Sequence, residues 1–196
     1  MFIQVFQGPC TRQDEVRNHL NGWRDANEAT ATGWLGGTFG FTDDNQLLGV
    51  VRFESRAAAE VNSGRPEQDA WASTLTGLLD GPLEFHDSDD VTLMMGGGSD
   101  DAGFVQIIRG QVDDPARLKA LLSQTDMLHE MRPDILGATL AFEPDGTFTE
   151  TIAFSSEAAA RAGEQTPPPE DVQRELEWAM NGATFYDLHS PWFETA

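Results

Sequence analysis

The stretch FIQVFQG, Phe2 to Gly8, returns 102 positions later as FVQIIRG, Phe104 to Gly110. Three further segments match in the same order at an offset of 101: WLGGTFGF over ILGATLAF, LLGVVRFESRAAA over FTETIAFSSEAAA, and LLDGPLEF over AMNGATFY. These collinear matches need a single one-residue gap, placed within residues 20–33. A repeat of about 100 residues is far longer than a solenoid unit, so it predicts a duplicated domain.

Each copy predicts the order strand, helix, strand, strand, helix, strand. The signals are apolar runs bounded by glycine and proline, and two hairpins closed by TDDNQ and EPDGT. Ser55 in one copy, and Ser155 or Ser156 in the other, can cap the second helix, which breaks at NSGRPEQ and at TPPPED. In the first copy the predicted elements are residues 2–7, 14–23, 34–41, 47–54, 55–79 and 83–87.

The order β-α-β-β-α-β is the ferredoxin-like unit, in which both helices cover one face of an antiparallel sheet. The fold class is therefore α+β, with two ferredoxin-like halves in tandem. We expect a first half at residues 1–95, a linker at 96–103 and a second half at 104–196. Two such sheets can bury their bare faces against each other, as an intramolecular version of a symmetric dimer.

Composition restricts the class of partner. The chain has 12 basic and 33 acidic residues, a net charge of −21. A strongly acidic surface repels nucleic acid and anionic membranes, so we expect neither as a partner. One cysteine, no signal-peptide pattern and no run of 18 apolar residues predict a soluble cytoplasmic protein.

A resemblance to a known protein family spans about residues 2–193, and it rests on the segments FIQVFQG, GWLGGT, RFESRAAA, RPEQ and EFHD. The chain resembles the dimeric α/β barrel superfamily and, within it, antibiotic-biosynthesis-monooxygenase-like proteins in a fused tandem form. It also resembles uncharacterised actinobacterial proteins. The resemblance implies that the two halves form a dimeric α/β barrel around a central cavity within one chain. The superfamily hosts monooxygenases, haem-degrading enzymes, peroxidases, isomerases and proteins without known activity.

Strand alternation predicts which side chains face that cavity. Val51 and Phe53 are apolar in both copies, which assigns them to the helices and leaves Arg52 for the cavity. The second copy has Ala153 in place of Arg52, so the first copy is the better candidate for a site. The predicted catalytic residues are His86 and Arg52, and the predicted ligand-binding residues are Gln4, Phe2, Phe6, Trp34, Thr38 and Glu84.

Two interpretations of these residues stay open. In the first, the protein is a cofactor-free monooxygenase-like enzyme acting on a small aromatic or phenolic compound, with His86 as the base and Arg52 holding the anion. In the second, Arg52 and Glu84 form an ion pair with His86 beside them, and the protein is a non-catalytic small-molecule-binding or structural protein. Asn62, Arg65 and Gln68 could border the cavity mouth, although a surface loop is the favoured interpretation.

Cofactors are not expected. The haem degraders of the superfamily carry a histidine late in the second helix and an asparagine on the first strand. Here residues 69–79 hold no histidine and the first strand has Gln4. No two histidines have metal-ligand spacing, so we expect no metal. Because the two halves already pair internally, we expect a monomer or weak homodimer with a small-molecule ligand.

Overall fold

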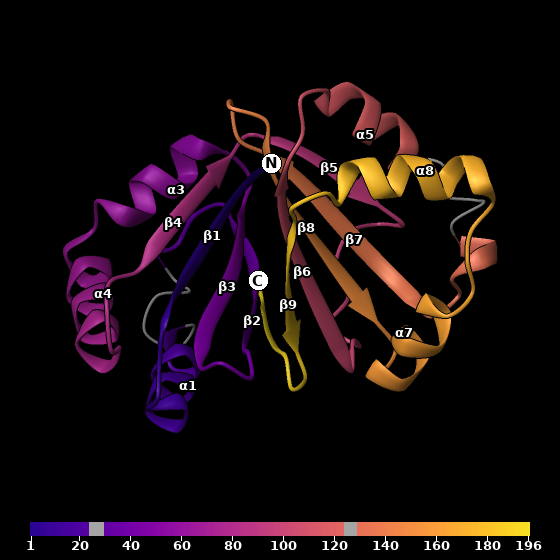
Figure 1. Ribbon diagram of the computed structural model, residues 1–196. Helices are drawn as coiled ribbons and strands as arrows, with labels where there is room; N and C mark the ends of the chain where they lie inside the picture. Colours follow the sequence, from indigo (N-terminus) through magenta and orange to yellow (C-terminus); the bar gives the residue numbers. More distant parts are fainter. Residues whose placement is uncertain (24–29, 124–128) are drawn as a thin grey trace. The chain divides into compact units, whose positions relative to one another are not determined.

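The computed structural model describes residues 1–23, 30–123 and 129–196. The chain divides into two compact units: unit 1 holds residues 1–89 and 192–196, and unit 2 holds residues 90–191. Each unit is a five-stranded antiparallel sheet with helices against one face (Figure 1). This is the predicted α+β architecture with duplicated ferredoxin-like halves, whereas the closure of both sheets into a barrel stays a prediction.

The elements follow the predicted order in both units. In unit 1 they are β1 (Phe2–Pro9), α1 (Gln13–Asn21), β2 (Trp34–Phe41), β3 (Gln46–Phe53), α3 (Arg56–Ser63), α4 (Pro66–Leu78), β4 (Glu84–Ser88) and β10 (Trp192–Thr195). In unit 2 they are β5 (Asp90–Met94), β6 (Phe104–Gln111), α5 (Pro115–Leu122), β7 (Ile135–Phe142), β8 (Thr147–Phe154), α7 (Glu157–Glu164), α8 (Glu170–Ala179) and β9 (Thr184–Leu188).

The duplication is visible in the strand register. Phe2 lies opposite Phe53 in unit 1, and Phe104 lies opposite Phe154 in unit 2. The strand that follows α1 or α5 also carries the same irregularity in both units, between residues 34 and 36 and between residues 135 and 137. Matching registers and matching bulges confirm that the repeated phrase marks a repeated fold.

The predicted helix caps are confirmed. Ser55 accepts a hydrogen bond from the amide N–H of Ala58, and Ser156 accepts one from Ala159. A second helix follows each of them after a short break: α3 ends at Ser63 and α4 begins at Pro66, whereas α7 ends at Glu164 and α8 begins at Glu170. Both breaks lie near the stretches expected from the glycine and proline residues.

The alignment of the last repeated strand needs a correction of one residue. Gln4 lies opposite Asp87, and Gln106 lies opposite Asp187, so β4 and β9 match at an offset of 100 instead of 101. Both pairs are hydrogen-bonded, at 2.9 Å and 2.8 Å between the amide nitrogen and the carboxylate oxygen. Phe85 therefore corresponds to Phe185 and not to Tyr186.

Each sheet also has a fifth strand that the repeat did not predict. The strand order is β10-β2-β3-β1-β4 in unit 1 and β5-β7-β8-β6-β9 in unit 2. The sequence predicts residues 90–95 in the first half and residues 192–196 in the second. In the structure β5 pairs with β7 of unit 2, and β10 pairs with β2 of unit 1.

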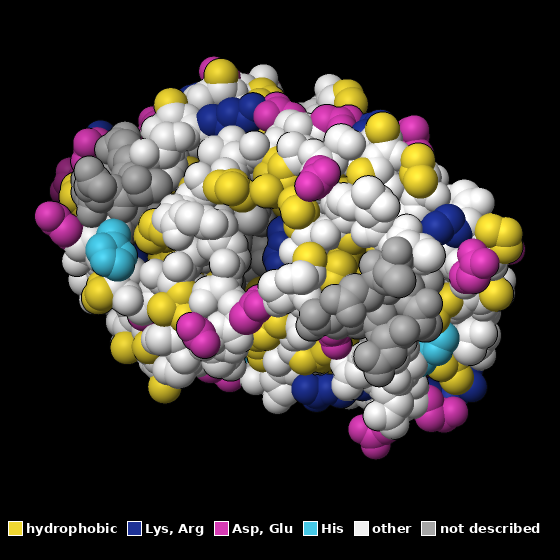
Figure 2. All heavy atoms as spheres, turned by 180° about the vertical axis from the view of Figure 1, so that it is seen from behind, with side chains coloured by type: hydrophobic (Ala, Val, Ile, Leu, Met, Phe, Trp, Pro, Cys, Tyr) yellow, Lys and Arg dark blue, Asp and Glu magenta, His cyan; other side chains and the backbone are white. Residues whose placement is uncertain are grey.

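The helices of each unit seal one sheet face with an apolar core. In unit 1 the helices contribute Val16, Leu20 and Leu75, which pack in one cluster with sheet residues such as Phe6 and Phe39. The equivalent cluster of unit 2 contains Leu118, Leu122 and Ala179 from the helices, with Ile108, Leu140 and Phe148 from the sheet. The acidic residues are spread over the visible surface in Figure 2, as a solvated coat would be.

Candidate functional site

A row of aromatic side chains crosses the whole sheet of unit 1 on the face covered by helices. Directly opposite residues of neighbouring strands give the row, from β4 through β1, β3 and β2 to β10: Phe85, Phe6, Gly49, Phe39 and Trp192. Ring centroids along the row are 6.3 Å, 6.1 Å and 5.7 Å apart. Opposite residues share a face of the sheet, so these rings form a continuous floor beneath the helices.

Two glycines allow the rings to lie flat on the sheet. A Cβ atom on Gly49 would stand 2.2 Å from the Phe6 ring, and one on Gly37 would stand 2.4 Å from the Phe39 ring. Real Cβ contacts are never that short, so any side chain at either position would displace a ring. The aromatic floor therefore depends on Gly37 and Gly49, because only glycine leaves room for the Phe39 and Phe6 rings.

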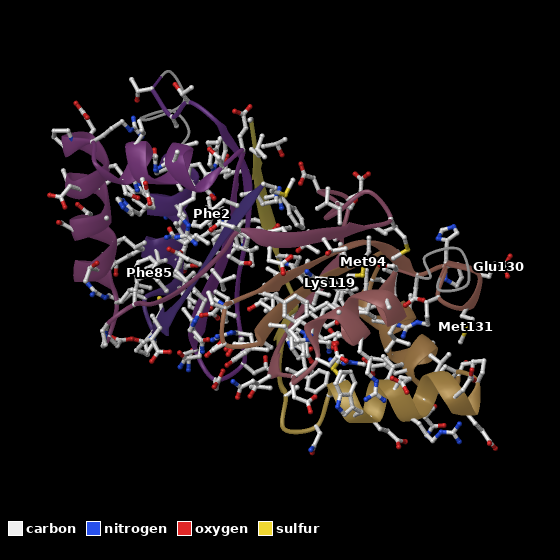
Figure 3. The ribbon with its side chains drawn as sticks, turned by 90° about the horizontal axis from the view of Figure 1, so that it is seen from above. Phe2, Phe85, Met94, Lys119, Glu130 and Met131 are labelled. Carbon is white, nitrogen blue, oxygen red and sulfur yellow. The ribbon has the colours of Figure 1, made fainter. Side chains whose placement is uncertain are left out.

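Between this floor and the helices of unit 1 lies a cavity of about 100 Å³. Residues from α1, α3 and α4 cover it, and Phe85, labelled in Figure 3 and 55% exposed, stands at its edge on β4. Most of its surface is apolar and aromatic, as is typical of small-molecule sites. The lining residues are Gln4, Phe6, Leu20, Trp23, Trp34, Phe39, Val51, Phe53, Asn62, Ser63, Gln68, Trp71, Ala72, Leu75, Leu83, Phe85 and Glu194.

Several polar groups of the lining are held in place by hydrogen bonds. The indole N–H of Trp23 donates to Oε1 of Gln68 over 2.8 Å, and Gln4 is held by its bond to Asp87. The guanidinium of Arg65 donates to the side-chain oxygen of Asn62. Because Arg65 occupies that oxygen, the amide NH₂ is the end of Asn62 that remains for a ligand.

Trp71 differs from these groups because its indole N–H is buried without a hydrogen-bond partner in the described part of the chain. Its ring stacks on the imidazole of His19, with centroids 4.6 Å apart and planes 17° from parallel. The backbone oxygen of Trp71 lies 3.0 Å from Nε2 of His19. The contact with His19 thus holds the Trp71 ring, which also lines the cavity, and its indole N–H is a buried donor without a partner, which is costly.

The predicted site residues separate onto two faces of the sheet. Gln4 lies opposite Val51, on the helix side, whereas Arg52 lies opposite Ile3 and His86 lies opposite Val5. Side chains alternate along a strand, so Gln4 and Arg52 point to opposite faces. The prediction that Gln4, Arg52 and His86 converge in one cavity is therefore wrong.

Of the predicted ligand-binding residues, Gln4, Phe6 and Trp34 line the cavity of unit 1. Phe2 lies on the same face, but it is packed in a separate cluster with Trp34 and Phe53 and is not part of the lining. The remaining predicted residues belong to the other face of the sheet: Thr38, Arg52, Glu84 and His86. There the guanidinium of Arg52 donates to the Thr38 hydroxyl over 3.3 Å.

Sequence reasoning missed the residues that give the cavity its polar character. The sequence favours a surface loop around Asn62 and Gln68 over a cavity mouth, whereas both residues line the cavity. Trp71 and Glu194 were not considered at all. Glu194 could not be placed from the repeat, because β10 pairs with unit 1 instead of with its own half.

Unit 2 carries a carboxylic acid where unit 1 has a glycine. Its equivalent row is Phe185, Ile108, Glu150, Leu140 and Thr92. Glu150 takes the place of Gly49 and is only 5% exposed. Burial away from water raises the pKa of Glu150 to about 7, from an ordinary value of 4.5.

Neither a cluster of metal-ligating side chains nor a helix that could span a membrane is found in the part of the chain that the structure describes. Residues 1–23, 30–123 and 129–196 contain no group of three or more His, Cys, Asp or Glu side chains arranged to hold a metal ion. Among the helices of the same residues, none is both long and apolar enough to cross a membrane.

Fold and cavity together define a two-unit α+β protein of the ferredoxin-like type, with an aromatic cavity between sheet and helices. Solved structures of full-length similarity are monooxygenase-like proteins built on the same fold. A protein from Lactobacillus acidophilus named for an inferred monooxygenase activity is similar over 97% of this chain and 95% of its own, with a TM-score of 0.72 and 13% identity.

Two further solved structures share the same fold. A protein of the same inferred activity from Fusobacterium nucleatum matches 99% of this chain and 94% of its own, with a TM-score of 0.74 and 10% identity. An anthrone oxidase-like protein matches 100% and 93%, with a TM-score of 0.67 and 12% identity. No family model and no curated protein matches the sequence. The comparisons therefore establish the fold, and the actinobacterial resemblance stays a prediction.

Proposed function

We propose that unit 1 binds a small aromatic compound carrying a hydroxyl group in the helix–sheet cavity and oxidises it with dioxygen, without a cofactor. The observation that carries the proposal is the buried indole N–H of Trp71, which lacks a partner among the described residues and belongs to an aromatic-lined cavity. A ligand oxygen is the acceptor that such a donor requires. The monooxygenase-like class of the structural neighbours supports the reaction type.

The size of the cavity limits the ligand. A cavity of about 100 Å³ is smaller than typical ligand pockets of roughly 300–1,000 Å³. An apolar cavity of about 150 Å³ accommodates one benzene ring. At about 100 Å³ the cavity must widen slightly even for one ring, so we propose a ligand with a single aromatic ring; a fused polycyclic ring system would require a much larger movement of the helices.

The chemistry needs no external reductant. A phenol with a free para position and one molecule of dioxygen give a quinone and one molecule of water, so one oxygen atom enters the ring and the other leaves as water. The phenol supplies all the electrons, most readily after losing its hydroxyl proton. Hydrogen-bond donation from Trp71 to the phenolic oxygen favours that charged form. The amide NH₂ of Asn62 is a second donor in the same cavity.

Oxygen uptake and binding test the proposal together. We expect one member of a panel of single-ring phenols and hydroquinones to bind saturably and to consume dioxygen in proportion to quinone formed. Trp71→Phe keeps an aromatic side chain but removes the donor together with the five-membered ring that carries it, so it should weaken binding by at least about fivefold, the worth of one hydrogen bond of about 1 kcal/mol. Trp178→Phe, in unit 2, is the matched control and should leave binding unchanged.

A second candidate function is binding without turnover. It is favoured by the absence of the predicted base and cation from the described lining residues, since His86 and Arg52 lie on the other face. Saturable binding that depends on Trp71 but consumes no dioxygen would establish this alternative. If no phenol binds, or if Trp71→Phe and Trp178→Phe behave alike, the cavity of unit 1 is not the site.

A further inference from the structure

Gln4 contributes an amide side chain from β1 to the lining of the cavity of unit 1. We propose that Gln4 determines ligand specificity, because its carbonyl oxygen accepts a hydrogen bond from a second hydroxyl group on the aromatic ring of the ligand. The inference rests on the proposed function and narrows its ligand class to dihydroxybenzenes with a free position para to one hydroxyl.

Asp87 on β4 fixes the orientation of the Gln4 amide. The two residues lie directly opposite each other, and Figure 3 labels Phe2 and Phe85 on the same two strands. Nε2 of Gln4 donates to Oδ1 of Asp87 over 2.9 Å. A carboxylate only accepts hydrogen bonds, so the NH₂ end of the amide faces Asp87 and the carbonyl oxygen is the end that remains for a ligand.

Arg56, the first residue of α3, holds the Asp87 carboxylate in turn. Its Nη1 lies 3.6 Å from Oδ2 of Asp87, and its Nε donates to Asp89 over 2.6 Å. The guanidinium also lies over the ring of Phe2, 4.7 Å from the centroid. One oxygen of Asp87 therefore accepts from Gln4, and the other faces Arg56.

Unit 2 repeats this arrangement with an arginine from a different position. Nε2 of Gln106 donates to Oδ1 of Asp187 over 2.8 Å, and Arg161 donates to Oδ2 of the same carboxylate. Arg161 is the fifth residue of α7, whereas Arg56 is the first residue of α3. Both units thus orient the same amide in the same way, and Gln106 is a matched control for Gln4.

The other two amide side chains of the described lining are oriented the opposite way. The side-chain oxygen atoms of Asn62 and Gln68 each accept a hydrogen bond from another side chain of unit 1, so their NH₂ groups remain for a ligand. The indole N–H of Trp71 is a donor as well. Among the amides of the described lining, Gln4 alone therefore offers its carbonyl oxygen.

Donors on α3 and α4 and an acceptor on β1 suit a ligand with two kinds of oxygen. A phenolate oxygen accepts from Trp71, whereas a hydroxyl at another ring position donates to Gln4. The Gln4 amide is uncharged, so it accepts from the hydroxyl without repelling the phenolate. A methoxy group in place of that hydroxyl has no proton to donate, and its oxygen would leave the Gln4 acceptor without a partner.

Calorimetry at pH 7 with phenol, resorcinol and meta-methoxyphenol tests the inference. Resorcinol should bind about fivefold more tightly than phenol, the worth of one added hydrogen bond, and at least about fivefold more tightly than meta-methoxyphenol. Gln4→Met keeps the length of the side chain and removes the acceptor, so each preference should fall by about fivefold. Gln106→Met is the matched control in unit 2 and should leave both preferences unchanged.

Asp87→Asn tests the orientation of the amide while Gln4 stays intact. Arg56 only donates hydrogen bonds, so the oxygen of the introduced amide faces Arg56 and its NH₂ group faces Gln4. The Gln4 amide then turns its NH₂ group to the ligand, and the preference for resorcinol over meta-methoxyphenol should fall by at least about fivefold. Asp187→Asn is the control in unit 2, and an unchanged preference in Asp87→Asn would contradict the orientation.

The inference and the proposed function can fail separately. Unchanged preferences in Gln4→Met, or equal effects of Gln4→Met and Gln106→Met, overturn the inference. Loss of the preferences in Glu194→Gln but not in Gln4→Met overturns it too, because the acceptor is then Glu194, which also lines the cavity. In each case, phenol binding that depends on Trp71 leaves the proposed function standing, whereas both fail together if none of the three probes binds.

Discussion

Replacing Glu150 by glutamine should stabilise unit 2 by an amount that depends on pH. Glu150 is 5% exposed, and its burial raises its pKa to about 7. The carboxyl is neutral in the folded protein at pH 6, whereas it is ionised in the unfolded chain, where its pKa is near 4.5. Ionisation thus favours the unfolded state, and the acid form favours the folded state.

The sign and magnitude follow from the two pKa values. Below about pH 4.5 the carboxyl is neutral in both states and costs nothing through ionisation. As the pH rises from 4.5 to about 7, the free energy of unfolding falls, and above 7 the loss levels off. At about 1.4 kcal/mol per unit of pKa, the full loss is about 3 kcal/mol.

Urea unfolding followed by circular dichroism between pH 5 and pH 8 measures this loss. The free energy of unfolding of Glu150→Gln, minus that of the parent, should grow by about 2 to 3 kcal/mol across this range. Taking the difference cancels the titration of the other carboxylates. Glu15→Gln, on the exposed side of α1, is the matched control and should show a difference independent of pH. A constant difference for Glu150→Gln as well would refute the reasoning.

Two further substitutions test the floor of the cavity. Gly49→Ala forces the Phe6 ring to move, so it should destabilise unit 1 by about 1–3 kcal/mol and weaken ligand binding. Gly77→Ala on α4 is the control, because a Cβ atom there meets no atom within 4 Å. It should be neutral or stabilise unit 1 by up to about 1 kcal/mol. Urea unfolding and calorimetry would show this, and equal behaviour of both variants would contradict a packed floor. Trp192→Ala removes a ring 5.7 Å from Phe39 and should cost about 3–5 kcal/mol in urea unfolding. A loss below about 1 kcal/mol would mean that β10 does not seal the core of unit 1.

The duplication and the element order could be predicted because they depend on local signals that occur twice. Repeated words, glycine–proline boundaries and serine caps act within a few residues of chain. The faces of β1 could not be predicted in the same way, because Phe2, Ile3, Val5 and Phe6 are all at most 6% exposed. Alternation is informative only where one face is polar, and the register with Phe53 decides the face instead.

The cavity was harder to predict because its polar groups come from segments far apart in sequence. Glu194 belongs to unit 1 because β10 pairs with β2, and no local sequence pattern predicts this pairing. Glu150, in contrast, did have a signal. It shares a strand face with Phe148, Ile152 and Phe154, all of them apolar, so alternation alone places a carboxyl in the core of unit 2.

The placement of β10 has a consequence for how the protein is made. Residues 89 and 192 are 103 positions apart, and unit 1 lacks a strand until the second of them has been synthesised. At about 5–20 residues per second, the ribosome takes about 5 to 20 s to cover that distance. During this time β2 presents an unpaired edge, and Phe39 lacks the cover of Trp192. Until β10 arrives, nascent unit 1 thus has an exposed strand edge and an incomplete apolar core, and its cavity lacks one of its lining residues, Glu194.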